Sequence, residues 1–296
     1  MSALIEVIDS GLSVTIQDRG RPGYRSIGVP LSGTLDPLLL AAANALLGND
    51  AQAAALEVVM SGPSLKAVAD SVRISLAGEL SAKVLRSNGN ILLVHPWSTA
   101  TLFPGDIAQV GAMRGGVGYV GISGGFLVST ALGSRATYQR AALGGVGGRA
   151  LALGDRLPCG HVQGDPWLER RSLHAFEHDA GPIRVILGPQ QAHFSGEAVQ
   201  SFLAHPYTVS RDMDRMGMRL DGVRLKHNER GAEIISDGVV PGSIQVPANG
   251  YPIVLMADCQ TSGGYPKIAT VISAELPRLG HAKPGTTLHF KSVGLP

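Results

Sequence analysis

The stretch GSIQVPANGYPIVLMADCQTSGGYPKIATVI, residues 242–272, contains three apolar runs separated by two polar interruptions. The runs SIQV, PIVLMA and KIATVI have the length and the Val/Ile content of short strands, and the Gly and Pro residues between them are turn signals. The second interruption, residues 258–265, carries a carboxylate, an amide and two hydroxyls, whereas a plain turn needs only two or three polar or Gly/Pro residues. The stretch therefore predicts consecutive strands with a ligand site at the end of one of them.

Composition supports a largely β architecture. The chain has 296 residues, 44% hydrophobic content, 39 glycines and only 5% aromatics, which favours many tight turns and enough apolar material for two domains. The formal charge of +2 comes with no Lys/Arg block, so neither nucleic acid nor a membrane surface is an expected partner. The N-terminus lacks a signal-peptide pattern, and Cys159 and Cys259 lie far apart, so we expect a cytoplasmic protein with no disulfide or zinc framework.

The pattern of short runs predicts two lobes. Residues 1–165 form a β-rich lobe with one buried helix, residues 166–181 gather charge and form a linker, and residues 182–296 form a second β-rich lobe. In the second lobe IRVIL, YTVS and EIIS are further expected strands, and GEAVQSFLA is compatible with a helix.

The clearest helix signal lies near the N-terminus. Asp36 can cap, Pro37 suits the first helical position, LLLAAANALL propagates the helix, and Gly48 can end it in a left-handed conformation. Because this helix is apolar nearly all round, it is expected to be buried, and the amide of Asn44 must find a partner inside the protein. That partner is either another group of the protein, in a structural hydrogen bond, or a ligand.

Three stretches match the spacing of familiar motifs but lack the sequence context that those motifs require. Gly116, Gly118 and Gly121 have the spacing of a dinucleotide fingerprint, but more glycine follows instead of a helix, which indicates a strand or bulge. Ser123 lies in GISGG without a following helix, so it is expected to be a strand-end hydroxyl. His174 and His178 lie four residues apart without a third ligand, which favours a solvated linker helix over a metal site.

Three stretches combine glycine with chemically capable side chains: GRPGYRSIGVPLSGTLD (20–36), VSRDMDRMGMRLDG (209–222) and residues 258–265 with the preceding GSIQVPANG. Any one of them alone is usually a solvated turn. Convergence of polar groups at a strand end beside flexible backbone is what a small-ligand site requires.

Long blocks of the sequence resemble one family. VPLSGTLDPLLLAAANALLGN, LGSRATYQRAALGGVGGRAL, GPQ, DRMGMRL, residues 242–272 and SAELPRL together are similar to the C subunit of 5-oxoprolinase, a family also called allophanate hydrolase subunit 2, KipA or the biotin-dependent carboxyltransferase family. The resemblance runs from about residue 10 to residue 290. Departures from the family pattern fall at Met213, where the family has a serine, at Ser262, where it has a threonine, and at His281, where it has a glutamine.

The resemblance implies a mainly β, cyclophilin-like barrel architecture in two lobes with a few helices. It also implies partners similar to the B and A subunits of 5-oxoprolinase, with which the complex couples ATP hydrolysis to the opening of 5-oxoproline to glutamate. ATP is then expected together with the B-type partner. In carboxyltransferase relatives a biotin carried elsewhere delivers CO2 to urea, and since this chain has no Met-Lys-Met motif, biotin must come on another chain. A biotin-dependent carboxyltransferase half and a KipA-like regulatory role stay open as alternatives.

The predicted site follows from the residues and the resemblance together. We expect Asp258, Gln260 and Thr261 to be catalytic, with Asp258 accepting the amide N–H of a small amide substrate and the others donating to its oxygen. Arg215 could hold a carboxylate or phosphate. The alternative is that Asp258 and Gln260 only tie a barrel turn together. No metal ligands are expected, and the complete set of expected substrate-binding residues is Ser262, Gly263, Gly264, Tyr265, Arg215, Asp214, Gln245, Gln190, Ser32, Asp36, Asn44 and Arg135.

Overall fold

The computed structural model describes residues 3–113, 115–162, 168–176 and 178–294. Contacts divide the chain into two compact units. The first unit comprises Met1–Arg21 and Ser32–Glu177, and the second comprises Pro22–Leu31 and His178–Pro296. The expected lobes of residues 1–165 and 182–296 stay a prediction, and residues 166, 167 and 177 of the expected linker lie outside the described residues. The segment Pro22–Leu31 belongs to the second unit, although its place in the sequence had predicted the first lobe.

Two antiparallel sheets build the first unit. The six-stranded sheet has the order β11-β1-β4-β9-β6-β7 and the five-stranded sheet the order β2-β3-β10-β5-β8. In chain order these strands are β1 (Ala3–Asp9), β2 (Thr15–Gln17), β3 (Ala55–Val58), β4 (Ser64–Ala69), β5 (Val72–Ala77), β6 (Ala82–Leu85), β7 (Ile91–Val94), β8 (Thr99–Leu102), β9 (Ile107–Val110), β10 (Gly118–Ile122) and β11 (Arg156–Cys159).

Alternation along the strands places the core between these two sheets. In β1 every second residue from Ala3 to Val7 is buried, and the inward residues join Leu56, Ile74 and Val120 of the five-stranded sheet in one apolar cluster. Period-two burial of this kind is what a strand with one core face and one outer face produces. Strand β1 therefore packs one face against the five-stranded sheet.

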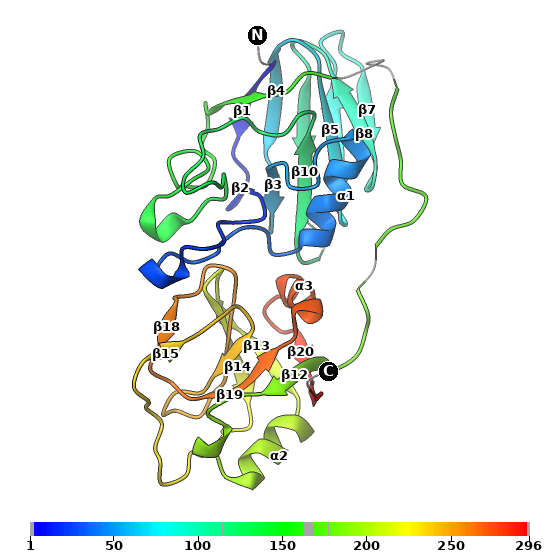
Figure 1. The fold of residues 1–296 in the computed structure, drawn as a ribbon. Coiled ribbons are helices and arrows are strands. Elements are labelled where there is room, and N and C mark those ends of the chain that lie inside the picture. The colour runs from blue at the N-terminus through cyan, green and yellow to red at the C-terminus, as the bar shows by residue number, and fades with distance from the viewer. Residues whose placement is uncertain (1–2, 114, 163–167, 177, 295–296) are drawn as a thin grey trace. The chain divides into compact units, whose positions relative to one another are not determined.

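Helix α1 (Pro37–Leu47) covers the outer face of the five-stranded sheet, against β10 and β5 (Figure 1). The carboxylate of Asp36 accepts hydrogen bonds from the backbone N–H groups of Leu38 and Leu39, and Gly48 ends the helix at φ 72°. Leu39, Leu40 and Ala43 pack with Ala55, Ala77 and Tyr119 in a second cluster. The predicted helix, its cap and its stop are all confirmed, because each depends only on local sequence.

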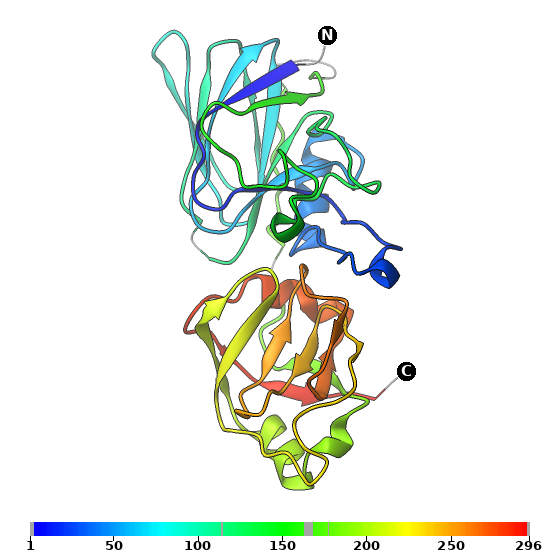
Figure 2. The same ribbon diagram turned by 90° about the vertical axis from the view of Figure 1, so that its left-hand side faces the viewer.

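The second unit is a nearly closed barrel (Figure 2). Its eight-stranded sheet has the order β20-β13-β14-β17-β16-β19-β12-β21. The first and last strands of that order, β20 (Thr287–Leu288) and β21 (Phe290–Ser292), are separated in the chain by His289 alone, so the two edges of the sheet must come together. The remaining strands are β12 (Ile183–Leu187), β13 (Tyr207–Met213), β14 (Gly217–Gly222), β16 (Ser243–Gln245), β17 (Ile253–Leu255) and β19 (Lys267–Val271).

Short elements complete the second unit. The helices are α2 (Gly196–Ala204), capped by the Ser195 hydroxyl, and α3 (Leu276–Gly280), and the 3-10 helix η1 (Arg25–Ile27) comes from the Pro22–Leu31 segment. Three further 3-10 turns occur, η2 (Gln139–Ala141) in the first unit and η3 (Gln191–His193) and η4 (Ser273–Glu275) in the second. A separate two-stranded ribbon pairs β15 (Asp237–Gly238) with β18 (Ser262–Gly263).

Two local expectations are wrong. The run EIIS, residues 233–236, is not a strand; pairing begins only at Asp237, and Ile235 is 96% exposed. Residues 168–176 form no helix, because Arg171 instead bridges to Ser98 and Arg170 donates its backbone N–H to Thr99. His178 packs against His281, with ring centroids 4.9 Å apart. Tertiary pairing overrides local propensity at Arg170 and Arg171, whereas at residues 233–236 the regular pairing that a strand needs is missing.

Two of the three motif matches, the glycine spacing and the one around Ser123, have the structures expected for them. Gly118–Ile122 is strand β10 inside the five-stranded sheet, and a Cβ at Gly121 would approach the Ser75 hydroxyl to 2.4 Å, so this glycine serves close packing. The Ser123 hydroxyl follows that strand and donates weakly to the Gly160 carbonyl at 3.4 Å. The fold class is confirmed as mainly β with few helices, and no helix in the described part of the chain has the length and apolarity of a membrane span.

Candidate functional site

The ribbon β15–β18 lies against the outside of the barrel. Alternate residues of β17, Ile253 and Leu255, form a small apolar cluster with Val239, which follows β15, and with Cys259. The ribbon continues beyond its strands, since Val239 donates its N–H to the Thr261 carbonyl and Ile234 donates to Gly264. Residues 258–265 thus run from the barrel into a ribbon that packs back onto it, and the polar side chains of the predicted site gather around this junction.

Asp258 and Arg215 form a two-pronged ion pair. Arg215 Nε and Nη2 lie 2.9 and 3.1 Å from the two carboxylate oxygens of Asp258, and the Asp258 backbone N–H donates to the Arg215 carbonyl at 2.7 Å. Only 8% of the Asp258 side chain and 16% of the Arg215 side chain are exposed. The structure therefore brings these two predicted residues together, with the fork of the guanidinium matched to the carboxylate.

The predicted amides also meet. Gln260 Nε2 donates to Gln245 Oε1 at 3.3 Å, and Gln245 Nε2 donates to the Tyr265 carbonyl at 3.4 Å. A Cβ at Gly263 would lie 2.5 Å from Gln245 Nε2, so the glycine allows the ribbon to approach this amide closely. Two residues from 258–265 and one from GSIQV hence share one hydrogen-bonded chain.

The sequence predicted only one member of a third polar group. Lys267 Nζ donates to Asp237 Oδ2 and to the Gly238 carbonyl, both at 2.6 Å, and Gln190 Nε2 donates to the same Asp237 oxygen at 3.0 Å. Gln190 was predicted, but Lys267 and Asp237 were not. The available signal was a lysine at the head of the otherwise apolar run KIATVI, since a lysine with 5% exposure is almost always paired.

Arg25 was also missed, although its stretch was recognised as rich in polar groups. Its Nη2 donates to the Val239 carbonyl and, at 3.3 Å, to the Gln260 carbonyl. The guanidinium also lies beside Cys259; burial raises the pKa of that thiol to about 11, against the lowering influence of Arg25. Arg25 therefore ties the Pro22–Leu31 segment to the ends of both strands of the ribbon.

Solvent reaches only part of this group. Ser262 and Tyr265 are exposed, Gln260, Thr261, Gly263 and Gly264 are half-buried, and Gln245 and Asp258 are buried. The solvent-accessible hydroxyls, amide N–H groups and glycine backbone can bind a polar ligand, while the buried charges hold them in place.

The other predicted residues have structural contacts. Asp214 accepts from the N–H groups of Met216 and Gly217 and so closes a turn. In the first unit, Asp36 caps α1, Arg135 Nε donates to the Val128 carbonyl, and Ser32 is buried with φ 54°. Asn44 donates to the Ala53 carbonyl at 2.8 Å and accepts from Asn49, the structural alternative for this amide. Ligand binding by these five residues stays a prediction.

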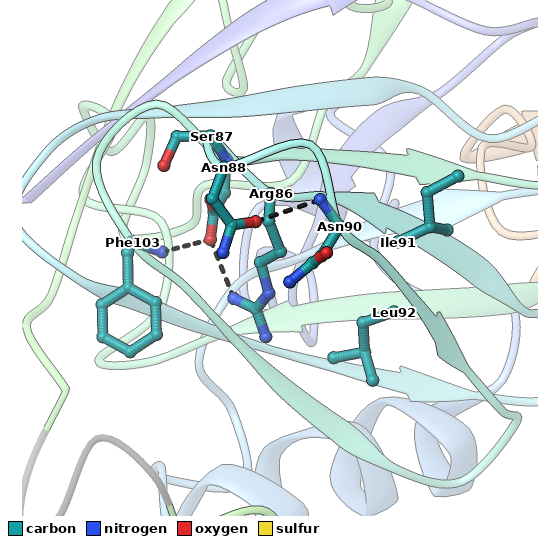
Figure 3. Close-up of a pocket in the computed structure, with 8 residues that line it drawn as sticks. Arg86, Ser87, Asn88, Asn90, Ile91, Leu92 and Phe103 are labelled. Atoms are coloured by element: carbon teal, nitrogen blue, oxygen red, sulfur yellow. Dashed lines mark hydrogen bonds and ion pairs between the residues drawn. The ribbon is translucent and has the colours of Figure 1, made fainter.

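A pocket of about 390 Å³ opens in the first unit, beside the β6–β7 turn (Figure 3). Asp106, which lines it, accepts from Arg86 at 2.8 Å and from the N–H groups of Ser87 and Phe103 at 2.9 Å. Burial alone would raise the pKa of Asp106, but these donors outweigh it and lower the pKa below its ordinary value. The charges of this pocket are satisfied within the turn, so the group around residues 258–265 is the stronger candidate.

Comparisons with known proteins find relatives over nearly the whole chain. Residues 27–292 match the family described as carboxyltransferase domain, subdomain A and B. The chain is 34% identical to the 5-oxoprolinase C subunit of Escherichia coli (strain K12), over 99% of this chain and 92% of that protein. It is 30% identical to the urea amidolyase of Lachancea kluyveri over 97% of this chain, which is 17% of that protein.

A solved structure shows the same fold. The crystal structure of Kluyveromyces lactis urea carboxylase matches with a TM-score of 0.86 and 28% identity, over 99% of this chain. The chain spans only 28% of that larger protein. The resemblance stated from the sequence blocks is thereby confirmed.

Proposed function

This chain belongs to the carboxyltransferase domain family, subdomain A and B, and from that membership we propose that it is one component of an ATP-dependent 5-oxoprolinase. In this role it binds 5-oxoproline and, with a partner of the B type, prepares the lactam for hydrolysis to glutamate. A protein of the A type completes the complex. A cytoplasmic location stays a prediction.

One observation carries the proposal: the hydrogen-bonded group of Gln245, Gln260 and the Asp258–Arg215 pair at the ribbon junction. Near full-length similarity to a 5-oxoprolinase C subunit supports the choice of substrate. A lactam resists attack because its nitrogen lone pair is delocalised, so a site must bind the amide edge and stabilise the charge that develops on oxygen.

Different residues can bind the amide edge and stabilise the charge on the oxygen. The Gln260 amide can pair with the lactam edge, and the hydroxyls of Thr261 and Ser262 and the backbone N–H groups of Gly263 and Gly264 can donate to the oxygen. Asp258 was expected to accept the substrate N–H. Because both of its oxygens receive hydrogen bonds from Arg215, we assign it instead to positioning the turn that carries Gln260 and Thr261.

ATP and biotin are assigned to other chains. The sequence contains no Walker A loop and no Met-Lys-Met motif, so ATP is proposed to bind with the B-type partner, and biotin to take part only where another chain carries it. For this chain the proposal requires only that it binds and orients the amide.

Reconstitution tests the proposal. The purified chain alone should show no 5-oxoproline-dependent ATP turnover, whereas the complex with B-type and A-type proteins should show it. Association should be stable at micromolar concentration, with a buried area above ~1,000 Å². Robust turnover by the chain alone, or a complex that forms but never consumes 5-oxoproline, contradicts the proposal.

A second function is favoured by the family description and by the similarity to urea carboxylase. In it the chain is half of a biotin-dependent carboxyltransferase, and the ureido ring of biotin takes the place of the lactam. Carboxylation of urea by the chain with a biotin carboxylase and a biotinylated carrier, without 5-oxoproline turnover, supports this alternative. Binding of a partner without either reaction supports a regulatory role.

A further inference from the structure

Two donors from different parts of the barrel converge on one oxygen atom. Lys267 Nζ lies 2.6 Å and Gln190 Nε2 lies 3.0 Å from Oδ2 of Asp237. Lys267 begins β19, Gln190 follows β12, and these two strands are paired neighbours in the barrel sheet. The second Asp237 oxygen accepts from the Gly238 N–H at 2.7 Å. An ammonium and an amide N–H that point at the same position can bind a carboxylate oxygen there. This position beside Lys267 and Gln190 is called the seat.

The donor Lys267 is buried, whereas Asp237, which accepts its hydrogen bond, is exposed to solvent. The Lys267 side chain is 5% exposed, whereas that of Asp237 is 51% exposed. A buried ammonium requires an anion and hydrogen-bond acceptors, and the Gly238 carbonyl supplies one acceptor at 2.6 Å. The anion comes from a two-residue strand of the ribbon. Lys267 stays buried, so Asp237 can rotate into water only when another anion takes its place beside the ammonium.

The seat adjoins the amide pair of the proposed site. Gln245 and Lys267 are direct partners across strands β16 and β19, so their Cα atoms lie about 5 Å apart. Gln245 in turn accepts from Gln260. One small molecule bearing both an amide and a carboxylate can thus meet Gln260 or Gln245 with the first group and Lys267 with the second.

We propose that Lys267 and Gln190 form a carboxylate-binding subsite, and that Asp237 fills it as an internal counter-ion until the carboxylate of a small amide ligand displaces it. The inference rests on the proposed function, because 5-oxoproline is a lactam with one carboxylate. It goes further by assigning the anchor and a competitor within the chain. The hydrogen bond from Lys267, which lowers the pKa of Asp237, shows that this seat favours an anion.

The test is a calorimetric titration of the full chain with 5-oxoproline and with 2-pyrrolidinone, the same lactam without the carboxylate. Wild type should prefer 5-oxoproline. Asp237→Ala removes the tethered competitor and should tighten 5-oxoproline binding at least about tenfold, since a tethered group competes at an effective millimolar concentration. Binding of 2-pyrrolidinone should not change. An unchanged 5-oxoproline affinity in Asp237→Ala overturns the inference.

Two further variants separate the anchor from stability. Lys267→Met should lose the preference for the carboxylate. In case that variant fails to fold, Gln190→Leu is a second test: it leaves the Lys267–Asp237 pair in place and should weaken the same preference. Arg184→Met breaks another ion pair of the second unit, to Glu275, and should leave the preference intact. A preference that survives in folded Lys267→Met, or that is undiminished in Gln190→Leu, also overturns the inference.

Turnover by the assembled complex distinguishes the two proposals. If the complex hydrolyses 5-oxoproline but Lys267→Met leaves KM unchanged, the subsite is wrong and the proposed function stands. If the complex hydrolyses no 5-oxoproline while the titrations show carboxylate-dependent binding that Asp237→Ala strengthens, the proposed function is wrong and the subsite stands.

Discussion

Arg25 donates from Nη2 to the carbonyl of Gln260, a residue 235 positions later in the chain, at 3.3 Å. The same nitrogen donates to the Val239 carbonyl. One side chain from the N-terminal half of the sequence therefore binds backbone carbonyls next to both strands of the ribbon in the second unit. The Pro22–Leu31 segment is part of that unit because of contacts of this kind.

Arg25→Ala should loosen the ribbon. It leaves two carbonyls without a charged donor, which should cost about 2 kcal/mol. Hydrogen exchange should show faster exchange at the Asp258 and Cys259 amides, which donate to Arg215 and Met256. Ser26→Ala, at an exposed position of the same 3-10 helix, is the control. Unchanged protection at both amides would show that Arg25 does not hold the ribbon.

Asp258→Asn tests positioning against catalysis. The substitution turns an NH2 group toward the mostly buried Arg215 guanidinium and removes the carboxylate charge beside it, which should cost about 3 kcal/mol of unfolding free energy. Thermal unfolding and turnover of the reconstituted complex should fall together. If the variant assembles and melts like wild type but turns over roughly a hundredfold more slowly, a loss of about 3 kcal/mol in the transition state, Asp258 is catalytic, as the sequence had predicted.

Local signals in the sequence were sufficient for the helix and most strands. Asp36, Pro37 and Gly48 specify the ends of α1 without help from distant residues, and the apolar runs IRVIL and KIATV form β12 and β19. EIIS is not a strand because an apolar run needs regular pairing with a neighbour: Ile234 donates to the Gly264 carbonyl, but regular pairing begins only at Asp237.

The site was predictable only in part, since its members come from distant segments. Residues 258–265 stand out as an excess of polar groups, Arg215 and Gln245 lie in two further stretches that combine glycine with polar side chains, and Gln190 comes from the family resemblance. Arg25 and the Lys267–Asp237 pair depend on pairings 235 and 30 residues apart, and no local pattern encodes such a contact. A buried lysine in an apolar strand was the one signal that single-sequence reasoning could have used.

Tyr119→Phe should destabilise the first unit. The Tyr119 hydroxyl donates to Glu57 at 2.6 Å and accepts from the Asp36 N–H at 3.1 Å, so it joins β10, β3 and the start of α1. Burial raises the pKa of Tyr119 well above its ordinary value, so the hydroxyl stays protonated. Its loss leaves buried Glu57 with one donor fewer, at a cost of about 2 kcal/mol. Urea unfolding measures this, with Tyr138→Phe as the control. Equal midpoints for the two variants would contradict the predicted role.

Acid should weaken the first unit through Asp155. The hydrogen bond from Arg149 lowers the pKa of Asp155 below the ordinary value of about 3.9. A lowered folded-state pKa contributes stability above the unfolded-state pKa, and that contribution disappears as the pH falls through the folded-state value. The contribution of Asp155 to the unfolding free energy should therefore be constant from about pH 7 to 5 and fall below about pH 4.

Asp155→Asn should flatten that fall, because asparagine cannot titrate yet keeps an acceptor for the Ala152 N–H. Urea unfolding at a series of pH values, with Glu79→Gln at an exposed position as the control, measures the slope. An Asp155→Asn curve parallel to wild type below about pH 4 would remove Asp155 as a contributor.

Gly263 and Gly264 offer a matched pair of substitutions at the proposed site. A Cβ at Gly263 would lie 2.5 Å from Gln245 Nε2, whereas at Gly264 the nearest atom would be the Ile234 carbonyl oxygen at 3.5 Å. Gly263→Ala must therefore push the Gln245 amide away from the Tyr265 carbonyl and from Gln260, while Gly264→Ala makes only an ordinary contact.

Because the far end of a glutamine can move, Gly263→Ala should cost at most about 1 kcal/mol of stability, yet it should reduce turnover by about tenfold or more by misplacing Gln260, an effect of about 1.4 kcal/mol on the barrier. The loss in Gly264→Ala should be clearly smaller. The measurement is turnover of the reconstituted complex beside thermal unfolding of each variant. Equal turnover in the two alanine variants, both folded, would mean that the Gln245–Gln260 pair does not contribute to the reaction.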